Sequence, residues 1–148
     1  MMFSGHSHHT LDEKWRLIVP SRYRALLGER FYILRSIESE DCFWIMPEKD
    51  CEDLFKRIKA TIKKDDAISR EWFKRIQESA ELCEEEKQGR VLVPPHLRSI
   101  LGKDEAKVTL TGMMNHLEVR STAKWQEKQS FDFSQACDYV NSKYDFEI

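Results

Sequence analysis

The sequence is poor in glycine, with five in 148 residues, and no glycine-rich loop of the kind that cradles phosphate is present. It also lacks a Gly-x-Ser-x-Gly nucleophile elbow and a His-Glu-x-x-His zinc motif. Three glutamates occupy positions 84–86, but adjacent carboxylates do not converge on one bond as a glycosidase pair does. These absences favour a protein that is not an enzyme and needs no cofactor.

Cysteine is scarce as well, and no Cys-x-x-Cys pair occurs. The four scattered cysteines are predicted to be reduced and buried: Cys42, Cys51, Cys83 and Cys137. Three histidines near the start have a spacing that metal ligands can show, but no cysteine is close to them in the sequence: His6, His8 and His9. We therefore predict no metal site and a solvated or DNA-proximal N-terminus.

No run of 18 or more apolar residues is present, which argues against a transmembrane helix and a membrane partner. Residues 1–10 lack the apolar core of a secretory signal, so a cytoplasmic location is predicted. The formal net charge of −2 argues mildly against nucleic-acid binding. However, residues 1–35 hold six Lys or Arg against three acids, so positive charge is concentrated in this segment.

A sequence repeat relates residues 11–28 to residues 85–102 at a fixed separation of 74 positions. Six residues of the first copy recur unchanged in the second: Arg16, Val19, Pro20, Arg24, Leu27 and Gly28 match Arg90, Val93, Pro94, Arg98, Leu101 and Gly102. Asp12 matches Glu86, so the carboxylate is retained. A gapless repeat of this length indicates two copies of one structural unit.

Each copy begins with an apolar run, at 17–19 and at 91–93, that is typical of a strand buried on both faces. A proline suited to the first turn of a helix follows, then apolar residues at helical spacing, then a glycine suited to a helix end. Two further strands complete each copy, and the expected pairs are 31–35 with 43–46 and 107–111 with 117–120.

Helical spacing of apolar residues between the copies predicts an α-hairpin, broken at 63–66 where an aspartate is a suitable N-cap. Another helix is expected from Ser121, with Trp125 packed against the body, and residues 131–148 are expected to form a loosely docked end. A half of about 40 residues is too small to be stable alone. We therefore predict an α+β fold in which the two halves interleave into one closed β-barrel.

The two motifs, residues 9–20 and 86–95, resemble the paired Asp-x-x-x-Arg motifs of the MraZ family, which has an AbrB-like swapped-hairpin barrel. Met2-Phe-x-Gly5, Ala80-Glu-x-Cys83 and Trp125 extend the resemblance over roughly residues 1–127. It implies a pseudo-two-fold barrel of two AbrB-like halves with an inserted α-hairpin and a C-terminal helix. The implied divisions are 7–51, 52–80, 81–125 and 126–148.

The resemblance further implies a sequence-specific regulator that binds double-stranded DNA near the promoter of a cell-division and cell-wall gene cluster. It implies ring-like homo-oligomers, association with the nucleoid, and direct repeats in the promoter. Arg16 and Arg90 would face the DNA. The supporting DNA contacts are predicted to be Lys14, Trp15, Arg22 and Lys87.

The sequence departs from the family pattern at two positions, with Trp15 where glycine is usual and Glu86 where aspartate is usual. Tryptophan tolerates a positive φ poorly, so a reshaped first turn is expected, with Trp15 packing at a subunit contact or adding a wedge to DNA. Asp12 and Arg16 would lie roughly 13 Å apart in a straight strand. Either a turn therefore brings a carboxylate to its arginine, or each pairs across a half or a subunit. The other interpretation is that these arginines only close structural ion pairs.

A second function remains open from the sequence, namely an AbrB-fold antitoxin-like module that binds a partner and has incidental DNA affinity. Antitoxins of that group carry one barrel half and a disordered tail. The two halves and the helical insert of this chain favour the regulator, whereas the weakly patterned tail favours the module.

Overall fold

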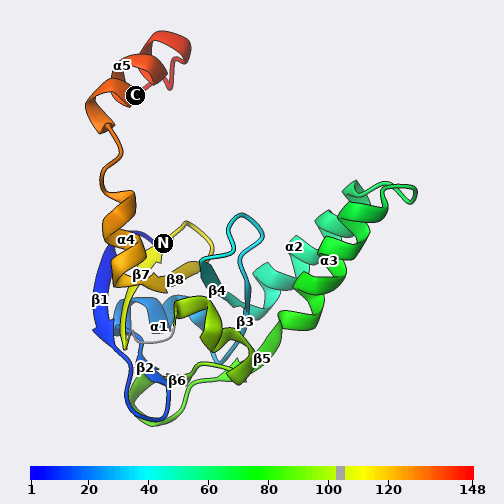
Figure 1. The fold of residues 1–148 in the computed structure, drawn as a ribbon, viewed down its shortest axis with the longest axis vertical. Coiled ribbons are helices and arrows are strands. Elements are labelled where there is room, and N and C mark those ends of the chain that lie inside the picture. The colour runs from blue at the N-terminus through cyan, green and yellow to red at the C-terminus, as the bar shows by residue number, and fades with distance from the viewer. Residues whose placement is uncertain (103–105) are drawn as a thin grey trace.

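The computed structural model describes residues 1–102 and 106–148. The protein has an α+β fold with antiparallel sheets, in which an α-hairpin extends from one side of a β-rich body and a terminal helix stands off another side (Figure 1). Among the described residues, no helix is both long enough and apolar enough to span a membrane.

Both copies of the repeat contain the same succession of elements. The first consists of β1 (His6–Thr10), β2 (Arg16–Ile18), α1 (Ser21–Leu27), β3 (Arg30–Arg35) and β4 (Cys42–Pro47). The second consists of β5 (Glu81–Glu84), β6 (Arg90–Leu92), the 3-10 helix η2 (Pro95–Leu101), β7 (Lys107–Gly112) and β8 (Leu117–Ser121). The four strands predicted after the repeated motifs are confirmed, as are the positive φ values of Gly28 (76°) and Gly102 (90°) that end the short helices.

The two copies are interleaved through their hairpins, β3–β4 of the first copy and β7–β8 of the second. The six-stranded sheet has the order β1-β7-β8-β4-β3-β5, so β1 pairs with β7, β4 with β8, and β3 with β5, each time across copies. The second sheet consists of β2 and β6 alone, again one strand from each copy. The core is shared accordingly: Leu17 and Val19 are buried together with Val91 and Val93. The larger hydrophobic core therefore belongs to both copies together.

The prediction that the motif strands are buried on both faces is wrong. Leu17 and Val91 point inward, but Ile18 is 54% exposed and Leu92 is 40% exposed. The β2–β6 ribbon covers the core with one face only, because its other face has nothing packed on it among the described residues. The prolines also differ from the expectation: Pro20 and Pro94 precede their helices as N-caps, and the second helix is 3-10, with Pro95 in its first turn.

The predicted α-hairpin consists of α2 (Glu48–Thr61) and α3 (Ala67–Ser79). Asp66 caps α3 by accepting a hydrogen bond from the Ser69 backbone N–H, as predicted. The base of the hairpin packs on β3 and β4 and buries Phe73 and Ile76 in a second hydrophobic cluster. Helical periodicity identifies both helices correctly because one apolar face of each is covered.

The predicted C-terminal helix is α4 (Thr122–Lys128), and Ser121 caps it by accepting a hydrogen bond from the Lys124 N–H. Trp125 packs against His6 and His8, with ring centroids 4.9 Å apart in both cases. His6 and His8 are exposed, in agreement with the solvated terminus that the sequence suggested, and their rings also form the packing surface for Trp125. Beyond α4, a short linker leads to α5 (Phe133–Lys143), which stands away from the body (Figure 1).

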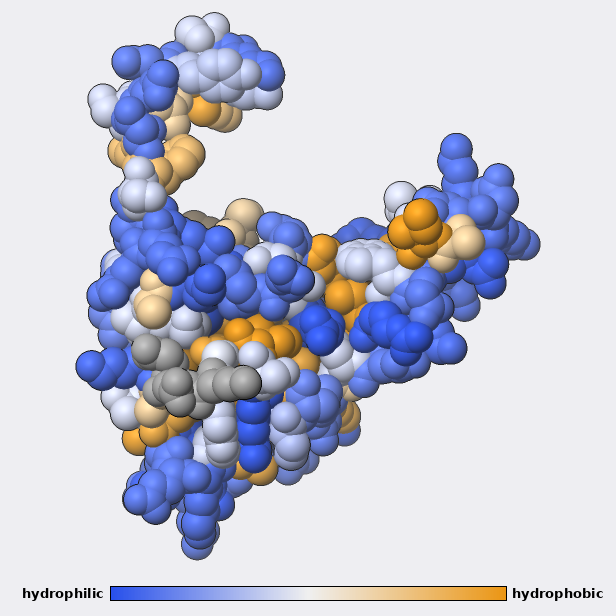
Figure 2. Space-filling view, in the orientation of Figure 1, coloured by the Kyte–Doolittle hydropathy of each residue, from blue (hydrophilic) through white to orange (hydrophobic). Residues whose placement is uncertain are grey.

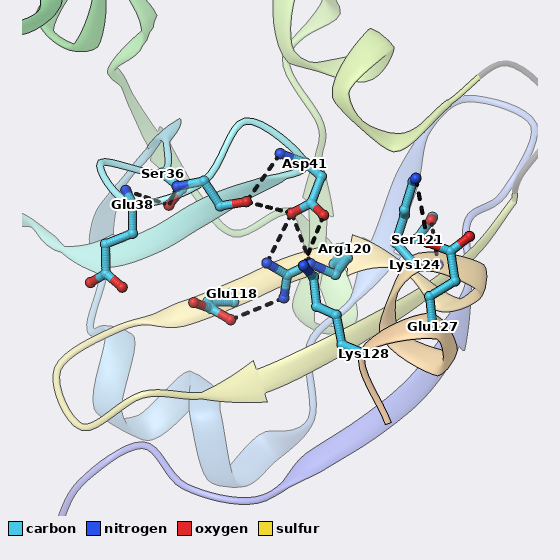
Figure 3. A network of polar contacts seen from close by, with 10 residues as sticks. Ser36, Glu38, Asp41, Glu118, Arg120, Ser121, Lys124, Glu127 and Lys128 are labelled. Carbon is cyan, nitrogen blue, oxygen red and sulfur yellow. Dashed lines mark hydrogen bonds and ion pairs between the residues drawn. The ribbon is translucent and has the colours of Figure 1, made fainter. Parts of the chain in front are cut away.

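A polar network joins the two copies beside α4 (Figure 3). Arg120 on β8 contacts Asp41 at 3.0 Å and Glu118 at 3.2 Å, and Lys128 lies 3.3 Å from Asp41. Burial raises the pKa of Asp41, but hydrogen bonds from Ser39 and Arg120 outweigh burial and lower the pKa to about 2. Since Asp41 precedes β4 and Arg120 lies on β8, the network fixes the β4–β8 junction from outside the core.

A buried histidine makes the stability of the fold depend on pH. His116 is 7% exposed and stacks on Trp44 with ring centroids 3.8 Å apart. Burial lowers its pKa from 6.5 to about 4, so the unfolded chain binds a proton between pH 6.5 and 4 that the folded chain does not. The stability contributed by neutral His116 is complete above pH 6.5 and decreases as the pH falls to 4.

We expect the free energy of unfolding to fall between pH 7 and pH 4.5 by about 2 kcal/mol through this residue. Urea unfolding at several pH values measures the effect. In His116→Gln the slope in this window should become shallower, since glutamine fills a similar volume but does not titrate. An identical slope in the variant and the parent would show that other groups cause the dependence.

Candidate nucleic-acid interface

Two turns lie side by side at the end of the β2–β6 ribbon, one from each copy of the repeat (Figure 1). In the first, Asp12 Oδ1 accepts hydrogen bonds from the backbone N–H groups of Lys14 (2.8 Å) and Arg16 (2.9 Å). The Arg16 N–H in particular lowers the pKa of Asp12, which therefore stays ionised. The motif aspartate thus closes its own turn through the backbone and does not pair with the Arg16 side chain.

The second turn is the 3-10 element η1 (Lys87–Gly89), which confirms the turn predicted from Lys-Gln-Gly. The two turns hold each other by reciprocal hydrogen bonds. The Trp15 carbonyl accepts from the Val93 N–H at 2.9 Å, and the Gly89 carbonyl accepts from the Val19 N–H at 3.0 Å. Because each turn is fixed by the other copy, the pair forms one rigid unit.

Trp15 occupies the position equivalent to Gly89, and both residues have positive φ, 63° and 74°. Trp15 therefore adopts the left-handed conformation that glycine has in the second turn. The two turns differ elsewhere, because Gln88 also has a positive φ (64°) in the second turn, whereas the first turn is closed by the Asp12 side chain. Two contacts compensate for that conformation. The ring is half-buried against the core, and the Arg98 guanidinium lies 5.3 Å from its centroid. Trp15 is thus packed within its own chain, and a subunit contact is not needed to cover it.

The space beside Gly89 is filled by Arg24, the counterpart of Arg98. A Cβ added at Gly89 would lie 2.6 Å from Arg24 Cδ, so a side chain at this position would require the Arg24 side chain to move. Arg24 and Arg98 therefore cover the two turns from the short helices. Both residues thus have a structural role at the turns.

Arg16 is paired across copies with Glu86, whose Oε2 lies 2.8 Å from Arg16 Nε. The Nε–H does not point at the oxygen, so the contact is an ion pair and not a hydrogen bond. The Arg16 side chain is 28% exposed and that of Glu86 is 39% exposed. The second motif carboxylate therefore fixes the first motif arginine, which is one of the two arrangements expected from the sequence.

The remaining predicted contact residues are all exposed: Lys14, Arg22, Lys87 and Arg90. The Arg22 guanidinium is held on α1 by Tyr23, 4.6 Å from the ring centroid and 3.1 Å from the hydroxyl. Seven of the eight predicted site residues lie in or directly beside the two turns, at an end of the molecule where the visible surface is strongly hydrophilic (Figure 2). Arg22 is the exception, because it lies on α1 beside Gly5, which precedes β1.

Two residues on this surface were missed. Ile18 and Leu92 lie on the outer face of the ribbon, beside Arg90 and Arg16 in the strand register. The continuous apolar pattern of 17–19 and 91–93 concealed them, because it does not distinguish a fully covered strand from a ribbon with one open face. Among the described residues there is no group of three metal-ligating side chains at this end or elsewhere.

The fold and the paired turns define a tandem-repeat protein in which two interleaved copies present one charged, two-turn surface. A family model described as "MraZ protein, putative antitoxin-like" matches residues 2–71 and 76–137. The chain therefore belongs to the MraZ family of transcriptional regulators, which is not a family of enzymes.

Several relatives are similar over most of their length. The Transcriptional regulator MraZ of Natranaerobius thermophilus is 33% identical over 99% of this chain and 100% of its own length. That of Carboxydothermus hydrogenoformans is 34% identical over 84% of each chain, and that of Desulfitobacterium hafniense strain Y51 is 36% identical over 85% of each.

Proposed function

We propose that this protein is a sequence-specific transcriptional regulator that binds double-stranded DNA with its paired turns. The observation that carries the proposal is the reciprocal locking of the two turns, which places Arg16 and Arg90 on one rigid surface. Membership of a family of transcriptional regulators supports it independently. A surface whose geometry is set before binding loses little conformational freedom on contact with DNA.

The residues have distinct proposed roles. Asp12 and Glu86 orient the turns and Arg16, whose remaining guanidinium nitrogens can meet a guanine edge or a phosphate. The other exposed cations, Lys14, Arg22, Lys87 and Arg90, neutralise phosphates along the backbone. Trp15 supports this surface from below and presents its half-exposed ring beside the DNA.

The proposal includes the finer description of the fold. The two sheets form a pseudo-two-fold barrel of two AbrB-like halves, residues 7–51 and 81–125, with the helical insert 52–80 and the tail 126–148. Strand pairing across copies in both sheets, at β1–β7, β4–β8, β3–β5 and β2–β6, supports this description. The chain works in the cytoplasm on the nucleoid, as a ring-like homo-oligomer at the promoter of its own cell-division and cell-wall gene cluster.

A head-to-tail ring presents the same surface in the same sense from neighbour to neighbour. We therefore expect the operator to consist of short direct repeats spaced near one helical turn, about 10 base pairs. Footprinting on the DNA upstream of the protein's own gene locates the repeats. Inverting one repeat at fixed spacing should weaken binding about tenfold or more, because one subunit then no longer meets its own bases. If an operator with an inverted repeat binds equally well, the head-to-tail arrangement is wrong.

A further inference from the structure

The α-hairpin contains a positively charged hollow that no role described so far uses. It has a volume of about 390 Å³ and lies between the end of α2 and the beginning of α3. Four cations line it, together with two apolar side chains: Lys59, Lys63, Lys64 and Arg70 with Ile62 and Phe73. Within the described part of the chain, none of the four cations forms an ion pair, and no carboxylate lines the hollow.

The segment after α4, residues 129–148, has the opposite character, and we call it the arm. It carries four carboxylates and one lysine, and the Lys143 ammonium is held over the rings of Tyr139 and Tyr144. Five of its aromatic side chains are more than half exposed: Phe131, Phe133, Tyr139, Tyr144 and Phe146. Apolar side chains that remain in water on a formed helix indicate a surface with a binding partner.

Aromatic and acidic residues alternate at both ends of the arm, as Phe131-Asp132-Phe133 and as residues 144–147, Tyr-Asp-Phe-Glu. Such a sequence fits a hollow with an apolar floor and a cationic rim, because the ring is buried while the neighbouring carboxylate meets ammonium groups. A phosphate backbone would satisfy the rim but would leave the partly buried Ile62 uncovered. The hollow therefore fits the arm better than it fits nucleic acid.

We propose that the arm of one chain docks into the hollow of the α-hairpin of a neighbouring copy. The arm and the hairpin rise from the body with open space between them (Figure 1), and apolar surface of the arm is exposed (Figure 2). Trp125 and Lys128 fix α4 to the body, and only four residues, 129–132, separate α4 from α5. These four residues span at most about 14 Å, which keeps the start of α5 close to its own α4, and the arm of this chain stands apart from its own hairpin (Figure 1).

An arm that leaves one chain and enters the hairpin of the next is a heterologous contact, which closes into a ring if the rotation permits. The inference therefore names the contact that would hold together the oligomer of the proposed function, and it rests on that oligomer. It does not depend on the DNA-binding surface, which lies at the other end of the β-rich body (Figure 1).

The test uses full-length variants and measures their mass by multi-angle light scattering at micromolar concentration. Lys63→Glu with Lys64→Glu reverses the rim of the hollow, and Asp145→Lys with Glu147→Lys reverses the arm. Each should reduce the assembly to a mass near the 17.6 kDa of one chain. The chain carrying all four substitutions should assemble again. Lys56→Glu with Arg57→Glu, on exposed residues of α2 outside the hollow, is the control with an equal charge change and should leave the assembly intact.

Circular dichroism establishes that each variant is folded, and a duplex with one operator repeat measures DNA binding by a single subunit. We expect the hollow variant to bind this duplex as the parent does. An unchanged mass in either reversal variant, or a parent that is itself monomeric, would overturn the docking proposal without touching the DNA-binding one. A hollow variant with unchanged mass and weaker DNA binding would overturn it in favour of a second DNA contact.

Discussion

Replacing Arg16 by alanine is expected to lower the affinity for the operator about tenfold or more, while the protein stays folded. A guanidinium that contacts a base edge contributes about 1–3 kcal/mol to the binding free energy. In an oligomer of the variant, this contribution is lost at every subunit that contacts DNA. The slope of log K against log salt should also become shallower, by about one for each phosphate that is no longer neutralised. Electrophoretic or fluorescence titrations at three salt concentrations measure both quantities.

The fold should tolerate this change because the Arg16–Glu86 pair is partly exposed, and such pairs contribute about 1 kcal/mol or less. Arg75→Ala is the control, since Arg75 is an exposed arginine on α3 whose ion pairs lie within that helix. Should folded Arg16→Ala bind its operator with the affinity and salt slope of the parent, the paired turns are not the DNA-binding surface.

Removing Arg120 is expected to cost about 3 kcal/mol of folding free energy, since the loss of one partner of a buried ion pair leaves the other uncompensated. The Arg120 side chain is 9% exposed, and without it Glu118, 14% exposed, loses the cation beside it. Asp41 would keep only Ser39 and the half-exposed Lys128. Urea unfolding of Arg120→Ala measures the cost. Lys128→Ala, which removes the exposed cation of the same network, should cost less than about 1 kcal/mol.

The pH dependence of unfolding distinguishes whether Arg120→Ala destabilises the fold through lost ion pairing or through lost packing alone. The pKa of Asp41 is lowered to about 2, so its stabilising effect is present above its unfolded value near 3.8 and is lost as the pH falls toward 2. In Arg120→Ala much of this lowering disappears, and the difference in stability between parent and variant should shrink below pH 3. A difference that stays constant down to pH 2 would assign the effect to packing alone.

Much of the fold could be predicted because the repeat supplies two independent copies of each local signal. Val19-Pro20 and Val93-Pro94 mark the same strand end, and Gly28 and Gly102 the same helix end. For the long-range strand pairing, the sequence predicted that the two copies share strands but did not predict which strands pair. The small size of each half required the copies to share strands, but the order of the sheet depends on side-chain packing that no local pattern encodes.

The position of the site was predictable, and its internal contacts were not. Asp12 and Arg16 are four residues apart in the sequence, yet the Arg16 side chain meets Glu86 of the other copy. Trp15 has a low propensity for positive φ, which argued for a changed turn, but reciprocal backbone hydrogen bonds and the Arg98 contact override that preference. Local propensity gives way here because tertiary contacts on both sides of the residue fix its backbone.

The order β1-β7-β8-β4-β3-β5 has a consequence for how the chain acquires its structure during synthesis. His8 pairs with Thr109, so the first strand has no partner until about one hundred further residues have left the ribosome. At 5–20 residues per second this takes roughly 5–20 s, during which the first half is an incomplete sheet with open edges. Pairings so distant in sequence also fold slowly. A chain truncated before β7 would therefore contain no half that is stable by itself. The whole sheet forms only once β7 and β8 are available.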